Sequence, residues 1–396
     1  MRPRRVELGL LILVWAIGSV CYATVDLATL GTLPVNYLAL LLGSGAVLLI
    51  GHIVVRRLAP HADPVLFPVA AMLNMLGLVM IHRLDVAAQL RAEVTDEKAP
   101  SPDAVAQATW VLVALVLFTL VLFLVTDHRR LQRYTYTSGV AGVVLLLLPL
   151  VPILGTSING ARLWVRLGPF SFQPSELAKI ALTIFFAGYL VRKREALATV
   201  RRKVLGLGIP RGRDFGPLLV AWLVALGVLA FERDLGTALM FFGVFVILLY
   251  VSTQRRSWLI IGAGLFALAA VLGYLAFGHV QLRVKIWLDP WTYANDEGYQ
   301  LVQALFGLAS GGLFGTGLGE GYPQFIPFAK TDFIAAALGE ELGLAGMMAI
   351  VMLFAILVER GLRTGLACRD PFGTLLAVGL SSVFALQVLV TIGGVT

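Results

Sequence analysis

The sequence is divided into apolar runs of about 20 residues, each long enough to cross a lipid bilayer as a helix. About eleven such runs occur, near residues 8–26, 36–55, 65–82, 107–126, 136–154, 174–191, 215–231, 233–252, 257–277, 332–358 and 371–393. The hydrocarbon core offers the backbone no hydrogen-bond partners, so a spanning segment must satisfy its own, as an α-helix does. The pattern predicts an all-α polytopic membrane protein with about 10–12 transmembrane helices, and we interpret the first run as an uncleaved span.

The composition excludes several classes of protein. Of the 396 residues, 59% are apolar and only 14% are charged, and the mean hydropathy is +0.88. Soluble domains are about 45–50% apolar and about 25% charged. The chain is therefore not a soluble enzyme, a disordered chain or a nucleic-acid-binding domain, and we expect no nucleic acid among its partners in spite of a net charge of +8.

The basic residues predict the orientation of the chain. If the N-terminus is cytoplasmic, 21 of the 31 lysines and arginines fall in the predicted inner segments and nine in the outer ones. Cytoplasmic loops carry such an excess of positive charge. We therefore expect a multi-pass protein of the cytoplasmic membrane with its N-terminus inside, where part of the charge also attracts anionic membrane lipids.

Common cofactor signals are missing from the sequence. The five histidines, at positions 52, 61, 82, 128 and 279, do not have the spacing of metal ligands. No G-x-x-x-x-G-K motif occurs, so a P-loop is excluded. We expect no zinc, haem or bound nucleotide.

Two outer segments are longer than simple connections. Residues 83–106 have mixed charge and two prolines, and we interpret them as a solvated extracytoplasmic loop. Residues 279–331 form a larger, aromatic-rich loop, in which Tyr299 to Ala309 have the spacing of a short interfacial helix. The glycine run that follows, Gly311 to Gly321, favours close backbone packing over a phosphate cradle.

A few ionisable residues lie inside or at the ends of spans. Glu176 suits the first turn of a helix, and Lys179 lies three residues later on the same face, within pairing distance. Ionisable residues in a span are costly, which favours a function for Lys179 and leaves Glu176 open between function and a helix-start pair. The ordinary interpretation of Asp234 is a cap on the next helix. Glu340 and Glu341, two turns into a span, must face a cavity or a cation.

These segments form ordered blocks that resemble the SEDS family of membrane proteins, which includes RodA, FtsW and SpoVE. Each block alone is weak, but their order over roughly residues 105–396 is specific. The blocks are Asn159-Gly160-Ala161-Arg162-Leu163-Trp164, Gln173-Pro174-Ser175-Glu176-Leu177-Ala178-Lys179, Asp234-Leu235-Gly236-Thr237, Gln281-Leu282-Arg283, Leu288-Asp289-Pro290, the glycine run, Thr331-Asp332-Phe333-Ile334 and Gly339-Glu340-Glu341-Leu342-Gly343.

The resemblance implies a peptidoglycan glycosyltransferase. Such a protein polymerises the lipid-linked precursor lipid II at the outer membrane face, beside a class B penicillin-binding protein that cross-links the glycan and with other elongasome or divisome proteins. The family's catalytic carboxylate corresponds to Asp332, and Asp289 is a rival that we interpret as structural or substrate-lining. The remaining matches imply substrate and pyrophosphate binding by Arg162, Trp164, Lys179, Gln281 and Arg283, and supporting or cation-binding roles for Glu176, Asp234 and Glu340. A divalent cation, Mg or Mn, near Asp332 is left open.

The expected organisation has three parts. Residues 1–82 hold extra N-terminal spans, a layout similar to actinobacterial RodA-type members; residues 83–106 form the first outer loop; and residues 107–396 form the SEDS-like core. The chain departs from the family pattern at Leu163 and Arg233, and the family's C-terminal span is expected to be missing.

The alternative is a flippase for lipid-linked precursors or a secondary transporter, which has the same length and span number. Transporters place ionisable groups near the midplane and often contain repeated halves. In this chain most charged motifs gather at the outer face and no internal repeat is found. The pattern therefore favours the polymerase and does not distinguish elongation from division.

Overall fold

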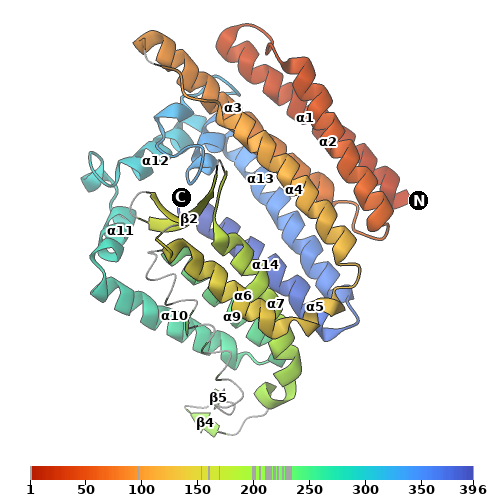
Figure 1. Ribbon diagram of the computed structural model, residues 1–396. Helices are drawn as coiled ribbons and strands as arrows, with labels where there is room; N and C mark the ends of the chain where they lie inside the picture. Colours follow the sequence, from red (N-terminus) through yellow and green to blue (C-terminus); the bar gives the residue numbers. More distant parts are fainter. Residues whose placement is uncertain are drawn as a thin grey trace. The chain divides into compact units, whose positions relative to one another are not determined.

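The computed structural model describes residues 2–96, 98–152, 154–158, 161–168, 170–198, 202–204, 207–209, 216, 220, 223–224, 227 and 234–395 (Figure 1). Within these residues, nine helices are long and apolar enough to cross a membrane, which confirms the predicted all-α polytopic class. The predicted span at 215–231 falls mostly outside the described residues. The chain forms two compact units: the first contains Met1–Thr126, His279–Arg360 and Thr391–Thr396, and the second contains Asp127–Gly278 and Gly361–Val390.

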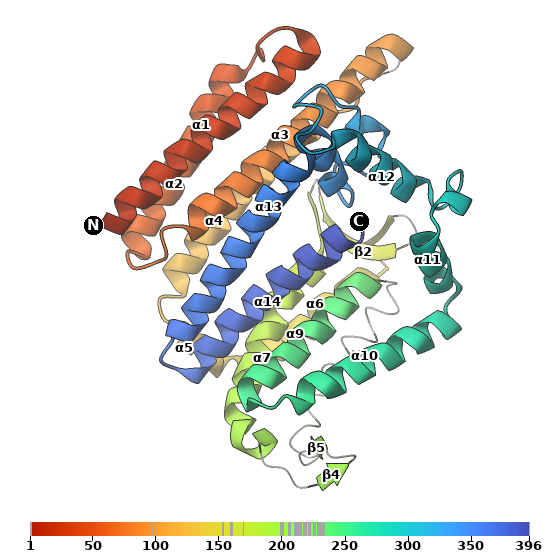
Figure 2. The same ribbon diagram turned by 180° about the vertical axis from the view of Figure 1, so that it is seen from behind.

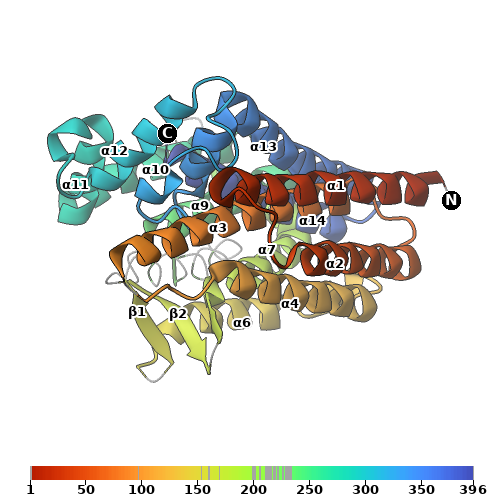
Figure 3. The ribbon, with the colours of Figure 1, turned by 90° about the horizontal axis from the view of Figure 1, so that it is seen from above.

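The first unit begins with four long helices. They are α1 (Arg2–Leu30), α2 (Tyr37–Leu58), α3 (Leu66–Thr95) and α4 (Asp103–Leu124). Helix α1 packs along α3 and against α2, while α4 contacts α2 and α3 (Figure 3). Leu11, Leu48 and Met75 lie in the buried cluster that joins the first three helices. The extra N-terminal spans are thus part of the packed first unit.

Helix α3 corrects the predicted boundary of the first outer loop. The loop was predicted to begin at residue 83, but the helix continues to Thr95. Arg83 and Asp85, which looked solvated in the sequence, are buried. Their charges are paired inside the protein, as described below, so they do not mark the end of the helix.

The rest of the first unit contains short helical elements followed by one long helix. The elements are α11 (Gly278–Leu288), η2 (Trp291–Tyr293), α12 (Tyr299–Gly311), η3 (Pro323–Phe325) and α13 (Ile334–Ala367), whose last residues belong to the second unit. Helix α12 confirms the predicted short helix. It buries Ala304, Gly307 and Gly311, while Phe306 on the other side is 54% exposed. Val302 and these small residues thus pack against the protein, while Phe306 lies on the exposed side.

The core of the second unit is helical. Its helices are α5 (Arg129–Arg133), α6 (Thr135–Leu147), α7 (Pro174–Ala198), α9 (Leu235–Thr253), α10 (Ser257–Ala276) and α14 (Pro371–Gly393). Helix α7 packs between α6 and α9 (Figure 2). Phe186, Leu248 and Phe372 are almost fully buried in the shared core. Helix α6 is shorter than the predicted run of 136–154, because Pro149 lies in a 3₁₀ turn, η1 (Leu148–Leu150), and cannot continue the α-helical hydrogen bonds.

Two small sheets in the second unit were not predicted. The antiparallel strands β1 (Gly155–Ile158), β2 (Ala161–Leu167) and β3 (Phe170–Phe172) form one, and β4 (Arg202–Val204) with β5 (Leu207–Ile209) forms the other. In the first sheet Thr156 is opposite Trp164 and Ser157 is opposite Arg162. The register therefore skips Leu163, which leaves a bulge between two candidate site residues.

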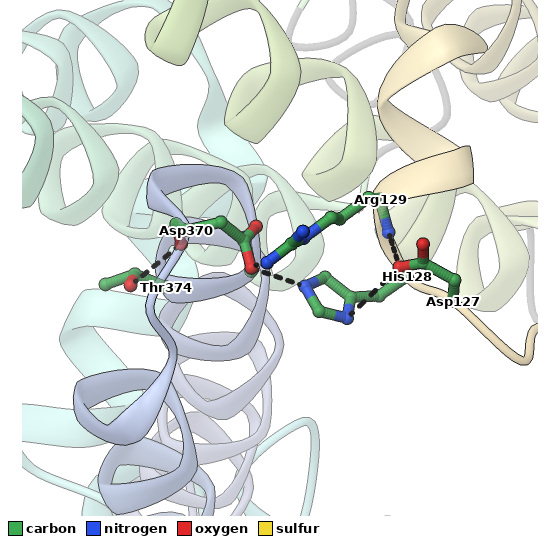
Figure 4. Close-up of polar contacts among 6 residues, drawn as sticks. Asp127, His128, Arg129, Asp370 and Thr374 are labelled. Atoms are coloured by element: carbon green, nitrogen blue, oxygen red, sulfur yellow. Dashed lines mark hydrogen bonds and ion pairs between the residues drawn. The ribbon is translucent and has the colours of Figure 1, made fainter.

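A polar contact joins the segment before α5 to the start of α14 (Figure 4). The Asp370 carboxylate accepts hydrogen bonds from Gly373 N at 2.8 Å and from the His128 ring at 2.9 Å, and Arg129 Nε lies 3.4 Å away. Burial alone would raise the pKa of Asp370, but these donors and the charge of His128 outweigh it and lower the pKa. The carboxylate thus caps α14 and holds two distant segments of the second unit together.

Candidate functional site

Helix α13 is broken near its start. Gly343 has φ 68° and ψ −174°, so the helical hydrogen bonds cannot continue through it. The glycine run replaces them. Four backbone hydrogen bonds connect the two segments: Thr316 N to Glu340 O at 3.0 Å, Gly317 N to Glu341 O at 3.1 Å, Leu344 N to Gly312 O at 2.9 Å and Ala345 N to Leu313 O at 3.0 Å. Protein groups thus satisfy the backbone atoms that the break frees, as a non-helical segment in a membrane protein requires.

The glycines of the run permit this contact. A Cβ atom on Gly315 would overlap Glu341 O, and one on Gly311 would overlap Gly339 O. Gly315, Gly317 and Gly319 also have positive φ angles of 85°, 104° and 90°. The prediction that the run serves close packing is therefore confirmed.

The two acids of α13 are buried against the end of the same run. Glu340 Oε1 accepts a hydrogen bond from Tyr322 N at 2.7 Å, and Glu341 Oε2 accepts one from Gly319 N at 3.1 Å. Arg83 Nε donates to Glu341 Oε1 at 2.8 Å. The sequence predicted a cavity or a cation beside these acids, and for Glu341 the structure provides a cation, Arg83 of α3.

Asp332 lies on the turn that leads into α13. Phe328, at φ 56°, places its carbonyl oxygen to accept from Thr331 N at 3.0 Å and from Phe333 N at 3.2 Å. Asp332 is exposed on this turn, and no described residue forms a hydrogen bond or ion pair with its carboxylate. The carboxylate is therefore open to accept a proton from a bound molecule.

Lys330, two residues before Asp332, is fixed between two acids. Its Nζ lies 2.6 Å from Asp85 Oδ1 and 2.7 Å from Asp103 Oδ2. Burial alone would lower the pKa of Lys330, but the hydrogen bonds to both carboxylates and their negative charges outweigh it and raise the pKa. The lysine is thus a charged anchor.

Helix α11 carries Gln281 and Arg283. Arg283 is exposed and Gln281 is half-buried. Asp289, just after this helix, accepts from Thr292 Oγ1 at 2.6 Å and from Thr292 N at 3.4 Å. The hydrogen bond from the Thr292 side chain is the main cause that lowers the pKa of Asp289. These contacts close a turn, which supports the structural interpretation of Asp289.

In the second unit, the predicted pair on α7 is present. Lys179 Nζ lies 2.7 Å from the Glu176 carboxylate and 3.0 Å from Oε1 of Gln387 on α14. The Lys179 side chain is 4% exposed, whereas that of Glu176 is 51% exposed. The buried ammonium is therefore held between an amide oxygen and a carboxylate that remains half exposed.

The other candidates of the second unit lie at the ends of elements or on a strand. Asp234 accepts from Thr237 N at 3.0 Å and caps α9, as the ordinary interpretation predicted. On β2, Arg162 is exposed and Trp164 is half-buried. The neighbouring Asn159, Gly160 and Arg233 lie outside the described residues.

The candidates divide between the two units. Arg162, Trp164, Glu176, Lys179 and Asp234 belong to the second unit, and Gln281, Arg283, Asp332 and Glu340 to the first. Among the described residues of each unit, one pair of candidates is in direct polar contact: Glu176 and Lys179. Sequence reasoning missed Arg83 and Asp85, although ionisable residues at the end of a span are a signal that could have found them.

The described side chains do not suit a metal ion on their own. No group of three or more His, Cys, Asp or Glu residues within that part of the chain could hold one. Asp332 therefore lacks the further protein ligands that Mg²⁺ or Mn²⁺ would need in a site built from protein alone. The divalent cation stays a prediction, and no catalytic step below depends on it.

Comparison with known proteins agrees with the order of the motifs. Residues 64–396 match the cell cycle protein family of FtsW, RodA and SpoVE. Over 346 residues the chain is 50% identical to the peptidoglycan glycosyltransferase RodA of Mycobacterium bovis, which covers 87% of this chain and 73% of that protein. Over 273 residues it is 34% identical to the stage V sporulation protein E of Bacillus subtilis, covering 68% and 71%.

One solved structure extends the likeness to the fold. It is described as "Structural coordination of polymerization and crosslinking by a peptidoglycan synthase complex", and a chain in it matches with a TM-score of 0.54 and 25% identity, over 90% of this chain and 86% of that one. The multi-pass membrane fold, the ordered motifs and these matches lead to one assignment. The chain belongs to the SEDS family of membrane proteins, the family of FtsW, RodA and SpoVE.

Proposed function

We propose that this protein is a peptidoglycan glycosyltransferase that polymerises lipid II into glycan strands at the outer face of the cytoplasmic membrane. The observation that carries the proposal is the exposed, unpaired carboxylate of Asp332, among the described residues, within the family's Thr-Asp-Phe motif. The 50% identity to proteins named as peptidoglycan glycosyltransferases supports it. The distribution of basic residues supports a cytoplasmic N-terminus.

The reaction needs a base. The acceptor sugar hydroxyl attacks the donor's anomeric carbon; a new C–O bond forms, and the bond to the polyprenyl pyrophosphate breaks. The hydroxyl proton must be removed as the new bond forms. We assign this role to Asp332, because a positioned carboxylate contributes about 10²–10⁴-fold to such a step.

The reaction also needs positive charge for the leaving pyrophosphate. Guanidinium groups bind phosphate oxygens bidentately, and an ammonium binds them as a point charge. We assign Arg162, Lys179 and Arg283 to this role, with Glu176 orienting Lys179 through their 2.7 Å contact. Gln281 and Trp164 are assigned to substrate contact. Asp234 and Glu340 are assigned supporting roles, because each accepts a hydrogen bond from a backbone N–H group.

We also propose a class B penicillin-binding protein as partner. The solved structure of similar fold is a peptidoglycan synthase complex that coordinates polymerisation with cross-linking. A polymerase alone makes uncross-linked strands, so a second enzyme must cross-link them. Co-purification with candidate transpeptidases from the same membrane tests this assignment separately from the activity.

The test of the function is polymerisation of lipid II by the purified protein. Glycan chains resolved by gel, formed without any other protein, are the expected result. The alternative is measured in parallel, as translocation of labelled lipid II across vesicles that contain the same preparation. Translocation without polymer would overturn the proposal and favour the flippase.

A further inference from the structure

Helix α3 directs three polar side chains of one short stretch to three different elements. His82 contacts α1, Arg83 contacts the glycine run and α13, and Asp85 contacts Lys330 and the start of α4. All three side chains are at least 85% buried. A buried charge is costly unless it is paired and hydrogen-bonded, so each contact restricts where its partner can lie.

The contacts of Arg83 and Asp85 fall on both sides of Asp332 in the sequence. Before Asp332, Arg83 Nη2 donates to Gly321 O at 2.6 Å and Asp85 accepts from Lys330 at 2.6 Å. After it, Arg83 holds Glu341 at 2.8 Å. The segment 321–341, which contains the turn with Asp332, is therefore attached to one helix at three points, one of them within the turn itself.

Of these three contacts, the one made by Lys330 is closest to Asp332 in the sequence. Only Thr331 separates Lys330 from Asp332. The Asp85 carboxylate that holds Lys330 also accepts from Ala104 N at 2.8 Å. Asp85 thus has both of its oxygens occupied by fixed partners, and a movement of Lys330 away from α3 would leave a buried carboxylate short of a partner.

Helix α1 holds the same end of α3. His82 Nε2 lies 2.6 Å from Asp26 Oδ1, and its Nδ1 lies 3.0 Å from the Tyr22 hydroxyl. With the ring proton on Nε2 donated to the carboxylate, Nδ1 accepts from the hydroxyl. A Cβ atom on Gly319 would meet Ala28 Cβ at 2.7 Å, so α1 also touches the glycine run. Residues before 64 lie outside the region that matches the family, so this support is supplied by the N-terminal extension.

We propose that Arg83 and Asp85 are positioning residues for the glycosyl transfer, which hold the Asp332 turn in its productive place through Glu341, Gly321 and Lys330. The inference rests on the proposed function, because these contacts matter for the rate only if Asp332 is the base. A base that is displaced by about 1 Å can lose about 100-fold in rate although every reacting group is present. The anchors touch the backbone and side chains around Asp332, and act on the reaction only through it.

The main variants are made at Lys330, because its side chain is less buried than that of Arg83 or Asp85. Lys330→Met removes the anchor from a side chain that is 29% exposed, and Lys330→Arg restores a cation of similar reach. Asp85→Asn weakens the same contact from α3. Arg91→Met is the matched control, since Arg91 is an exposed cation on the same helix.

In the lipid II assay, Lys330→Met and Asp85→Asn are expected to lower kcat per folded molecule by about 10–100-fold and to change KM less than about two-fold. The unfolding temperature of Lys330→Met should also fall, because the buried Asp85 carboxylate loses its cation, so the folded fraction is measured for each variant. Lys330→Arg should recover most of the rate, and the double variant should lose no more than the worse single one, because both remove one contact. Activity of Lys330→Met within about two-fold of the parent, or a loss that appears in KM instead of kcat, would overturn the proposal.

A second measurement does not depend on activity. Hydrogen exchange of the Thr331 and Phe333 amides, which bond to Phe328 O, reports the order of the turn. Exchange should be faster in Lys330→Met and unchanged in Arg91→Met. If the parent protein makes no polymer, the proposed function fails, and the exchange data still decide whether α3 fixes this turn. Unchanged exchange in Lys330→Met would overturn the positioning role whatever the activity.

Discussion

Lys179 and Glu176 form an ion pair whose two members differ in their access to water. The ammonium is almost completely buried and the carboxylate is half exposed, although their atoms are 2.7 Å apart. Removing the carboxylate and removing the ammonium should therefore change the free energy of unfolding by different amounts. Glu176→Met leaves a buried cation with Gln387 as its remaining described partner and should lower the free energy of unfolding by about 1–3 kcal/mol.

Lys179→Met should be the milder change for stability and the harsher one for activity. It leaves a carboxylate that water can solvate, so the stability cost should be below about 1 kcal/mol. The proposed phosphate contact is lost, and polymerisation should fall by at least about ten-fold. Thermal unfolding and the lipid II assay on both variants check this order. A larger stability loss in Lys179→Met than in Glu176→Met would contradict this pairing.

Asp332→Asn should abolish most of the catalysis without a change in stability. The asparagine cannot accept the hydroxyl proton, so kcat is expected to fall by about 10²–10⁴-fold. The exposed side chain forms no contact with a described residue whose loss would unfold the protein. Asp289→Asn is the comparison, because its turn contacts with Thr292 are structural and most activity should remain. A well-folded Asp332→Asn protein with full activity would show that the base is another group.

Gly343→Ala should prevent folding. The residue has φ 68° and ψ −174°, a region that is nearly restricted to glycine, and a Cβ atom would overlap Gly315 N. Strain and overlap together should cost about 3 kcal/mol or more. Gly77→Ala is the control: this glycine is inside α3 with open space around its Cβ position, and the change should stabilise by about 0.5–1 kcal/mol. The yield of folded protein and its unfolding temperature measure both effects, and a stable Gly343→Ala protein would contradict the break.

The Asp370 contact predicts a dependence of stability on acid pH. The folded protein lowers the pKa of Asp370 below its ordinary 3.8, because Gly373 N–H and His128 stabilise the ionised form more than burial opposes it. The stabilisation is thus fully present above pH 3.8 and is lost as the pH falls through the lower folded value. The unfolding temperature of the parent should exceed that of Asp370→Asn at pH 6, and the difference should shrink towards pH 3.

A control at an exposed site separates this effect from general acid unfolding. Asp296→Asn, at an exposed position between η2 and α12, should follow the parent at every pH. A gap between the parent and Asp370→Asn that stays constant down to pH 3 would mean that the carboxylate charge is not what holds α14 to the segment before α5.

The sequence predicted the features that depend on neighbouring residues. The spans follow from apolar length, and Glu176 with Lys179 follows from helical spacing of three residues. The cap at Asp234 is equally local, because a side chain at the start of a helix reaches the third backbone N–H of that helix. In each of these cases the partner is fixed by the geometry of a single element.

The contacts that could not be predicted join distant parts of the chain. Arg83 and Glu341 are separated by 258 residues, and His128 and Asp370 by 242. The sequence contains several acids that could pair with each of these side chains, and only the packing of distant segments determines which one does. The strands before α7 were missed for a related reason, since their pairing around Leu163 gives no helical or alternating pattern in the sequence.

The break at Gly343 changes where the membrane is expected to begin along α13. The helix has 34 residues, which is more than a bilayer requires. From Leu344 to Ala367 it retains about 24 residues, or about 36 Å at 1.5 Å per residue, which is enough to cross the hydrocarbon alone. The segment before the break is therefore not needed to cross the hydrocarbon. Glu340 and Glu341 belong to that segment, and the position of one glycine fixes where it ends and the crossing helix begins.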